Sequence, residues 1–163
     1  MNNADVETLL IECRDELVQV KTLVDGLGMG SNIVPYLNKY SIVRACGAVE
    51  VSFKTIVTDY VERRSKAQIK RYLRKYVRES SKNPSYKNIC SLLKDFDEVW
   101  STEFKTRVKA HADWIRIQDS MQSLVDSRNE FAHGGHPVAS VAHVQNYFGD
   151  FEIVLEILDD IVN

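Results

Sequence analysis

Residues 117–137 read IQDSMQSLVDSRNEFAHGGHP, and this stretch decides how the rest of the chain is interpreted. Ile117, Met121 and Leu124 recur every three to four residues, which is the period of an amphipathic helix. The same period leads on to Arg128, so a guanidinium falls where a core residue is expected. An unpaired charge in a core is costly, so Arg128 needs a partner, or must face a cleft or a second subunit.

The same stretch also indicates where this helix ends. Gly134, Gly135 and Pro137 predict that a helix over about 110–132 stops before them. Outward from here, apolar residues at helical spacing predict further helices at about 3–24, 35–63, 66–79, 86–96, 98–108 and 141–162. The glycines of residues 26–31 lack the spacing of a phosphate loop, and these residues are interpreted as a flexible connection.

No segment shows the alternation of a strand, and no internal repeat is evident. The sequence therefore predicts an all-α fold: a four-helix up-and-down bundle, with short additional helices inserted between the second and third long helices. We expect one domain over residues 1–163, with a basic helical insertion at about 63–108.

Composition limits where the protein works. The N-terminus is polar and acidic, and no apolar run approaches membrane-spanning length, so we expect a cytoplasmic protein without membrane contact. Cys13, Cys46 and Cys90 are odd in number and widely spaced, which predicts reduced and packed thiols.

The formal net charge of −2 hides a strongly basic segment at residues 63–87. Ten Lys or Arg residues against the single Glu79 give this segment +9, which leaves −11 for the rest of the chain. Tyrosines are interleaved with the cations, and such a face can stack bases and contact phosphates. The cations predicted to bind RNA are Arg63, Arg64, Lys70, Arg71, Arg74, Lys75 and Arg78. The alternatives are a solvated face or a surface for an acidic protein.

Two features of the second predicted helix draw attention. Gly47 lies in its interior, which hints at the close approach of a neighbour. Glu50 flanks the apolar stripe, and it is either an ordinary solvated glutamate or the carboxylate that pairs with Arg128.

The chemistry of the motif depends on Arg128 and His133. Five residues on one helix separate two side chains by about 140°, so the two share a face only if the last turn unwinds at the glycines. A histidine at a helix C-terminus can serve as acid or base. With an arginine that binds phosphate, it can cleave RNA without a metal, because the 2′-hydroxyl supplies the nucleophile. The alternative is a salt bridge or a helix cap.

Other histidines carry weaker signals. His136 could be an auxiliary proton carrier, or simply an exposed loop residue. His111 and His143 have no carboxylate or cysteine at metal-ligand spacing, so neither a metal site nor a cofactor is predicted.

Residues 128–134, RNEFAHG, resemble the R-x4-H signature of the HEPN superfamily. Residues 46–51, CGAVEV, are similar to the second-helix motif of its RiboL-PSP-type branch. The resemblance runs from about Tyr40 to Asp160, which is most of the chain.

This resemblance implies a four-helix bundle that dimerises and brings two R-x4-H motifs into one cleft. It also implies a metal-independent endoribonuclease of a toxin–antitoxin or antiphage-defence system, with an antitoxin or other defence protein as a further partner. By position, Arg128 would bind the scissile phosphate, His133 would act as acid or base, Asn129 would orient the site, and Glu50 would support it. The alternative is a non-catalytic helical module that binds RNA or protein.

Overall fold

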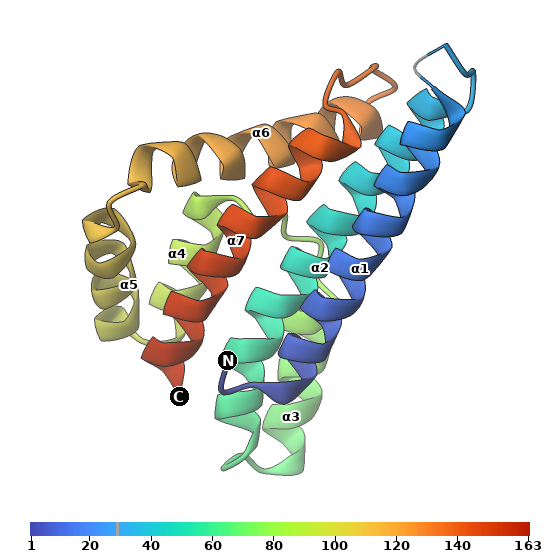
Figure 1. The fold of residues 1–163 in the computed structure, drawn as a ribbon. Helices are drawn as coiled ribbons and strands as arrows, with labels where there is room; N and C mark the ends of the chain where they lie inside the picture. The colour runs from blue at the N-terminus through green and yellow to red at the C-terminus, as the bar shows by residue number, and fades with distance from the viewer. Residues whose placement is uncertain (29) are drawn as a thin grey trace.

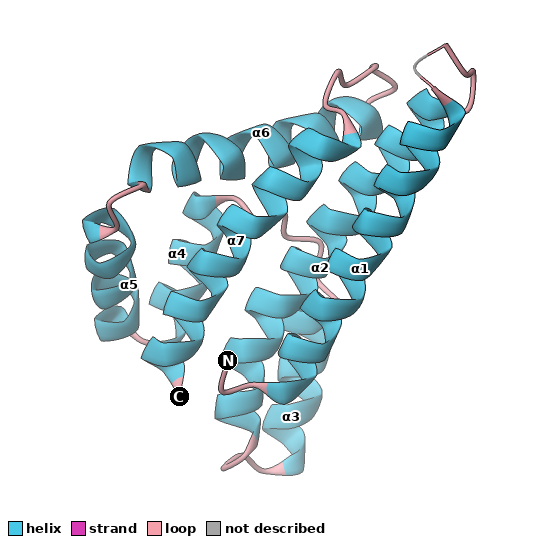
Figure 2. Cartoon of the chain, in the orientation of Figure 1, coloured by secondary structure: helices cyan, strands magenta, loops and turns pink. Residues whose placement is uncertain are grey.

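The computed structural model describes residues 1–28 and 30–163; Met29, in the predicted connection 26–31, lies outside the described residues. Over the described residues the chain forms seven α-helices and one π-helical turn, without a strand (Figures 1 and 2). The elements are α1 (Ala4–Leu27), α2 (Val34–Glu62), α3 (Ala67–Leu73), the π-helical turn η1 (Arg74–Arg78), α4 (Tyr86–Phe96), α5 (Glu98–Ala110), α6 (Trp114–Ala132) and α7 (Val141–Val162).

Four long helices enclose the core. α2 packs against α1 and α7, and α6 packs against both α7 and α2. Phe53 of α2 and Phe148 and Phe151 of α7 are fully buried between them. The short elements lie between α2 and α6, and α6 runs obliquely to the other long helices in Figure 1. The all-α prediction is confirmed, and a simple up-and-down order of four helices stays a prediction.

Polar side chains cap the starts of three helices. Asn3 accepts the backbone N–H of Val6 at 3.1 Å, and Asp97 begins α5 in the same way. Ser140 opens α7 in a capping box with His143. Ser65 does not cap α3, because its hydroxyl donates to the carbonyl of Val61 at 2.7 Å and α3 begins after Lys66.

The predicted helix over 110–132 ends where expected but begins later. His111 is extended (φ −65°, ψ 135°), so α5 stops at Ala110 and α6 begins at Trp114. The imidazole of His111 accepts the N–H of Asp113 at 3.2 Å, and the Trp114 ring packs 5.1 Å from that of Tyr86. This break turns α6 out of line with α5, toward α7 and α2.

The three cysteines are free and buried, as predicted. None of the helices formed by residues 1–28 and 30–163 has the length and apolarity needed to cross a membrane.

Candidate functional site

The R-x4-H residues lie at the C-terminal end of α6, where it meets the first half of α2. Arg128 is half-buried, and its guanidinium donates to the side-chain oxygen of Asn129 at 3.3 Å. Cys46 of α2 lies close to it: burial raises the pKa of that thiol to about 12, and the positive charge of Arg128 opposes the rise. The guanidinium therefore sits at the seam between α6 and α2.

The two glycines after His133 end α6 in a Schellman motif. His133 is the C-cap, and Gly134 follows with φ +83°. The N–H of Gly134 donates to the carbonyl of Phe131, and that of Gly135 to the carbonyl of Glu130 at 2.8 Å. A Cβ on Gly135 would stand 2.9 Å from the carbonyl oxygen of Glu130, so the chain needs a glycine there too. The local sequence thus leaves the His133 side chain exposed just beyond the helix.

Arg128 and His133 do not contact each other. In the part of the chain that the structure describes, Arg128 has no carboxylate within ion-pair distance, and its hydrogen bond goes to Asn129. α6 stays helical to Ala132, so the unwinding of its last turn that would bring the two side chains onto one face does not occur before His133. A ligand or a second subunit must bridge these two side chains before they can act on one group.

The start of α2 contributes a cation that the sequence did not reveal. Lys39 lies 3.3 Å from Nδ1 of His136 and 5.5 Å from the ring centre of Phe131. Asn38 accepts the N–H of Val141 at 3.0 Å, which fixes the loop 133–140 against α2. We call Lys39, Arg128, Asn129, His133 and His136 the motif cluster. Its charged side chains are all basic.

Glu50 is not the partner of Arg128, so that predicted pair is wrong. Its carboxylate lies 2.6 Å from the ammonium of Lys54, which is only 3% exposed, and accepts the backbone N–H of Lys82 at 3.2 Å. Lys54 also donates to the carbonyl of Ser80. A buried ammonium requires a carboxylate nearby, and Lys54, one turn further along α2, is closer to Glu50 than Arg128 is. Glu50 thereby ties α2 to the segment after η1.

The predicted RNA-binding cations lie at the other end of α2. Figure 1 shows α3 beside the last turns of α2, and the loop after α6 near the first turns. Glu62 follows Lys39 by 23 residues, which at about 1.5 Å per residue separates the two ends by about 35 Å. Within one chain, the structure therefore does not bring the basic segment and the motif cluster together.

These cations differ in their exposure and in whether they form ion pairs. Arg78 is half-buried and paired with Asp59 and Glu62, and Arg74 pairs with Glu79 at 3.1 Å. The cations of this set that are exposed and lack an ion pair in the described residues are Arg63, Arg64, Lys70, Arg71 and Lys75.

α3 and η1 expose an aromatic pair next to the cations. Leu73 and Val77 point into the core, whereas Tyr72 and Tyr76 are 58% and 56% exposed, with ring centres 4.7 Å apart. Lys75 lies 5.2 Å from the centre of the Tyr76 ring. The apolar period of this segment predicts Ile69, Tyr76 and Val77 on the inward side and leaves Tyr72 or Leu73 open. The prediction is wrong for Ile69 and Tyr76, because Leu73 and Val77 form the buried side.

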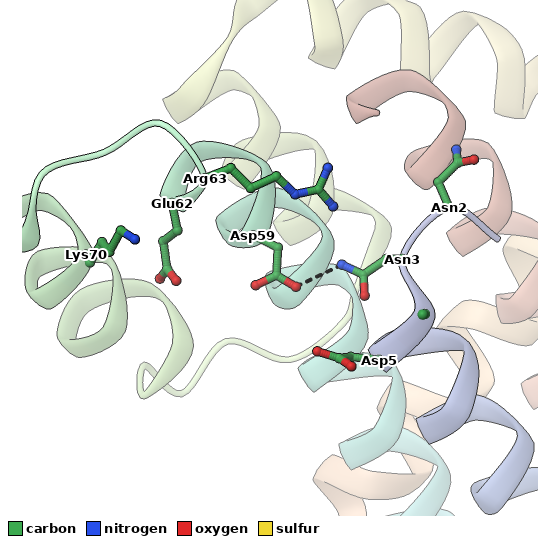
Figure 3. A pocket seen from close by; sticks show the side chains of 8 residues that line it. Asn2, Asn3, Asp5, Asp59, Glu62, Arg63 and Lys70 are labelled. Carbon is green, nitrogen blue, oxygen red and sulfur yellow. Dashed lines mark hydrogen bonds between the residues drawn. The ribbon is translucent and has the colours of Figure 1, made fainter.

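A hollow of about 470 Å³ lies between the start of α1, the end of α2 and α3 (Figure 3). Asp5, Asp59 and Glu62 line it together with Arg63 and Lys70, and Asn3 donates to Asp59 at 2.9 Å. Three carboxylates against two cations make it a poor phosphate site. A second hollow of about 440 Å³ is lined by four cations and two acids: Lys70, Arg71, Arg74, Arg78, Glu62 and Glu79. It is the better place for a phosphate.

No group of three His, Cys, Asp or Glu side chains suited to a metal occurs among the residues with described positions. His143 takes part in the capping box of α7, and His111 accepts a backbone N–H at the break before α6. Both histidines therefore serve helix ends.

The family model described as RiboL-PSP-HEPN matches residues 8–163. No curated protein and no solved structure matches the chain. The matched range includes both α2 and the whole motif cluster.

Proposed function

Because the chain belongs to the RiboL-PSP-HEPN family, we propose that it is a metal-independent endoribonuclease whose active site is completed across a homodimer. HEPN domains are generally ribonuclease-like or nucleotide-binding. The observation that carries the proposal is Arg128: a half-buried guanidinium, without a carboxylate partner among the described residues, at the end of α6 that also presents His133. A phosphate oxygen is the acceptor that such a guanidinium fits best.

The proposed reaction needs no group from outside the protein and the RNA. The 2′-hydroxyl attacks the adjacent phosphorus, the bond from phosphorus to O5′ breaks, and the products are a 2′,3′-cyclic phosphate and a 5′-hydroxyl. Arg128 stabilises the charge that builds on the phosphate oxygens, and Asn129 holds its guanidinium in place. His133 takes the proton of the 2′-hydroxyl or gives one to O5′.

Cleavage needs both a base and an acid, which is the reason for proposing two subunits. One chain offers a single His133 at the motif, and His136 is already in contact with Lys39. Two copies of the motif supply two His133 side chains and two Arg128 guanidinium groups. His136 remains an auxiliary candidate, and Glu50 supports the site only through the fold of α2.

The basic segment is proposed to hold the RNA strand away from the scissile bond. Arg63, Arg64, Lys70, Arg71 and Lys75 supply cations without ion pairs, and Tyr72 and Tyr76 can stack bases. Arg74 and Arg78 line the second hollow together with Lys70 and Arg71, although each already has an acidic partner. The substrate class is therefore single-stranded RNA.

The test is cleavage of a 5′-labelled single-stranded RNA in excess EDTA. We expect products with 2′,3′-cyclic phosphate ends. The cleavage rate of His133→Ala should be lower than that of the wild type by a factor of about 100 or more. His111→Asn, at the break before α6, is the matched control and should keep full activity. Activity that EDTA abolishes, that survives in His133→Ala, or that persists on a substrate with 2′-deoxy linkages would contradict the proposal.

A toxin or antiphage effector is the cellular role that we propose. Induced expression of the chain in a bacterial host should stop growth, and His133→Ala should relieve the arrest at equal protein level. Equal growth arrest by both proteins would refute a role that depends on cleavage.

The exposed pair of Tyr72 and Tyr76, flanked by cations, also favours a second candidate: a non-catalytic module that binds RNA or an acidic protein. Such a module binds RNA with an affinity that falls steeply with salt and that Arg128→Ala leaves unchanged. Absence of cleavage, together with this binding behaviour, would select it.

A further inference from the structure

The segment over α3 and η1 uses one order of residue types twice. Residues 70–73 read KRYL and residues 74–77 read RKYV, and a further cation, Arg78, follows. Each unit is two cations, a tyrosine and an aliphatic residue. Because four residues are close to one helical turn, each type forms its own row along the segment. The aliphatic row is buried and the tyrosine row is exposed, and the cations form the two rows in between.

The π-helical turn keeps the first row of cations, Lys70, Arg74 and Arg78, in line. The N–H of Glu79 donates to the carbonyl of Arg74 at 3.0 Å, five residues back, so this turn is wider than an α-helical one. Each residue therefore turns the chain by a smaller angle, and Arg78 stays on the same side as Arg74, where it pairs with the end of α2. Turns of this kind are frequent at functional sites.

The second hollow lies between this row and the end of α2, and it leads no further. Arg78 closes its α2 side, because the guanidinium pairs with Asp59 and Glu62. Glu62 and Lys70 also line the first hollow, so the two hollows adjoin (Figure 3). The three carboxylates of the first hollow repel a polyanion. An RNA strand that enters the second hollow has no favourable way onward, so the end of a strand fits it best.

The charge of the second hollow suits a terminal phosphate. Its four cations and two carboxylates leave a surplus of two positive charges. A phosphate monoester carries about −1.5 to −2 at pH 7, whereas a phosphodiester within a strand carries a single negative charge. Lys70 and Arg71 have no ion pair in the described residues. The pair of Arg74 with Glu79 is exposed, so a phosphate can replace that carboxylate.

We propose that the second hollow binds the terminal phosphate monoester of an RNA strand, and that the bases next to this end stack on Tyr72 and Tyr76. Arg71 and Lys75 form the second row of cations, between the hollow and the tyrosines, where they can follow the backbone of the strand. The two tyrosine rings, with centres 4.7 Å apart, offer one stacking surface.

The inference rests on the proposed function in taking RNA as the ligand, and it adds that the protein recognises the end of the strand. The proposed cleavage leaves a 2′,3′-cyclic phosphate and a 5′-hydroxyl, and neither of these is a phosphate monoester. The hollow therefore separates the original phosphorylated end of a strand from the ends that cleavage creates.

The test measures binding of a short, internally labelled 2′-O-methyl RNA by fluorescence anisotropy with the full chain. This RNA has no free 2′-hydroxyl, so it cannot be cleaved by the proposed reaction. It is used with a 5′-phosphate, with a 3′-phosphate, and with hydroxyls at both ends. We expect one phosphorylated form to bind about tenfold more tightly or more than the hydroxyl form. Which of the two does so gives the direction of the strand.

Variants of the hollow identify where the phosphate binds. Lys70→Met and Arg71→Met, at two exposed positions, should each reduce the tenfold difference to about twofold or less. Lys87→Met removes an exposed cation of the basic segment that does not line the hollow, and this matched control should keep the difference. Tyr72→Ala should weaken binding of all three forms by a similar factor and keep their ratio.

Equal affinity for the three forms, or a difference that survives in both Lys70→Met and Arg71→Met, would overturn the proposal. Adenosine 5′-monophosphate tests the other source of a phosphate monoester: if it binds as tightly as the phosphorylated RNA, the hollow is a site for a free nucleotide and the proposal is wrong. A protein that distinguishes the ends but cleaves no RNA would support the hollow and refute the nuclease. A nuclease that binds all three forms equally would do the reverse.

Discussion

Glu50→Ala should lower the free energy of unfolding, because it leaves the buried charge of Lys54 without its carboxylate partner. The Lys54 ammonium is 3% exposed, and Glu50 at 2.6 Å is its only carboxylate partner in the described residues. Removing one member of a buried ion pair costs about 3–5 kcal/mol, since the other charge stays desolvated. The backbone N–H of Lys82 loses its acceptor as well. In a chain of 163 residues, a loss of about 3 kcal/mol lowers Tm by about 6–12 °C.

Urea unfolding followed by circular dichroism measures this effect, and the double variant Glu50→Leu/Lys54→Met identifies its cause. Because neither charge is then buried, the double variant should recover about 2 kcal/mol or more of the loss. Glu12→Ala, on the exposed face of α1, is the control for removing a carboxylate. The reasoning fails if Glu50→Ala stays within about 0.5 kcal/mol of the wild type, or if the two single changes add without coupling.

Three further predictions concern the end of α6 and the cations of η1. Arg128→Ala should abolish cleavage. It should lower the free energy of unfolding by about 1 kcal/mol or less, since it removes one hydrogen bond and no ion pair. A loss above about 3 kcal/mol in urea unfolding would make Arg128 a structural residue. Gly134→Ala should cost about 1–2 kcal/mol in the same assay because its φ is +83° while its surroundings are open, and no change would contradict the Schellman end. Lys75→Met should weaken RNA binding and reduce the slope of log affinity against log salt concentration by about one ion. Arg78→Met should instead lower Tm, because Arg78 pairs with Asp59. The reverse pattern would make Arg78 the RNA contact and Lys75 the structural residue.

Local sequence signals predicted the parts of the site that depend on local structure. The pair Gly134 and Gly135 predicted the end of α6 at Ala132. The residue after the C-cap needs a positive φ, and Gly134 adopts it without strain. Ser140 and Asp97 are local signals of the same kind, because their side chains accept N–H groups in the first turns of α7 and α5.

Choices between tertiary partners could not be predicted in this way. Lys39 and His136 are 97 residues apart, and no local pattern links them. The partner of Glu50 is a different case, because Lys54 lies four residues further along one helix, a spacing that is itself a signal. Arg128 was the partner considered for Glu50 beside plain solvation, because a charge on a core stripe needs a carboxylate. The rotation of α3 and η1 against α2 decides that Leu73 is buried and Tyr76 exposed, whereas the apolar period alone predicts Tyr76 inward.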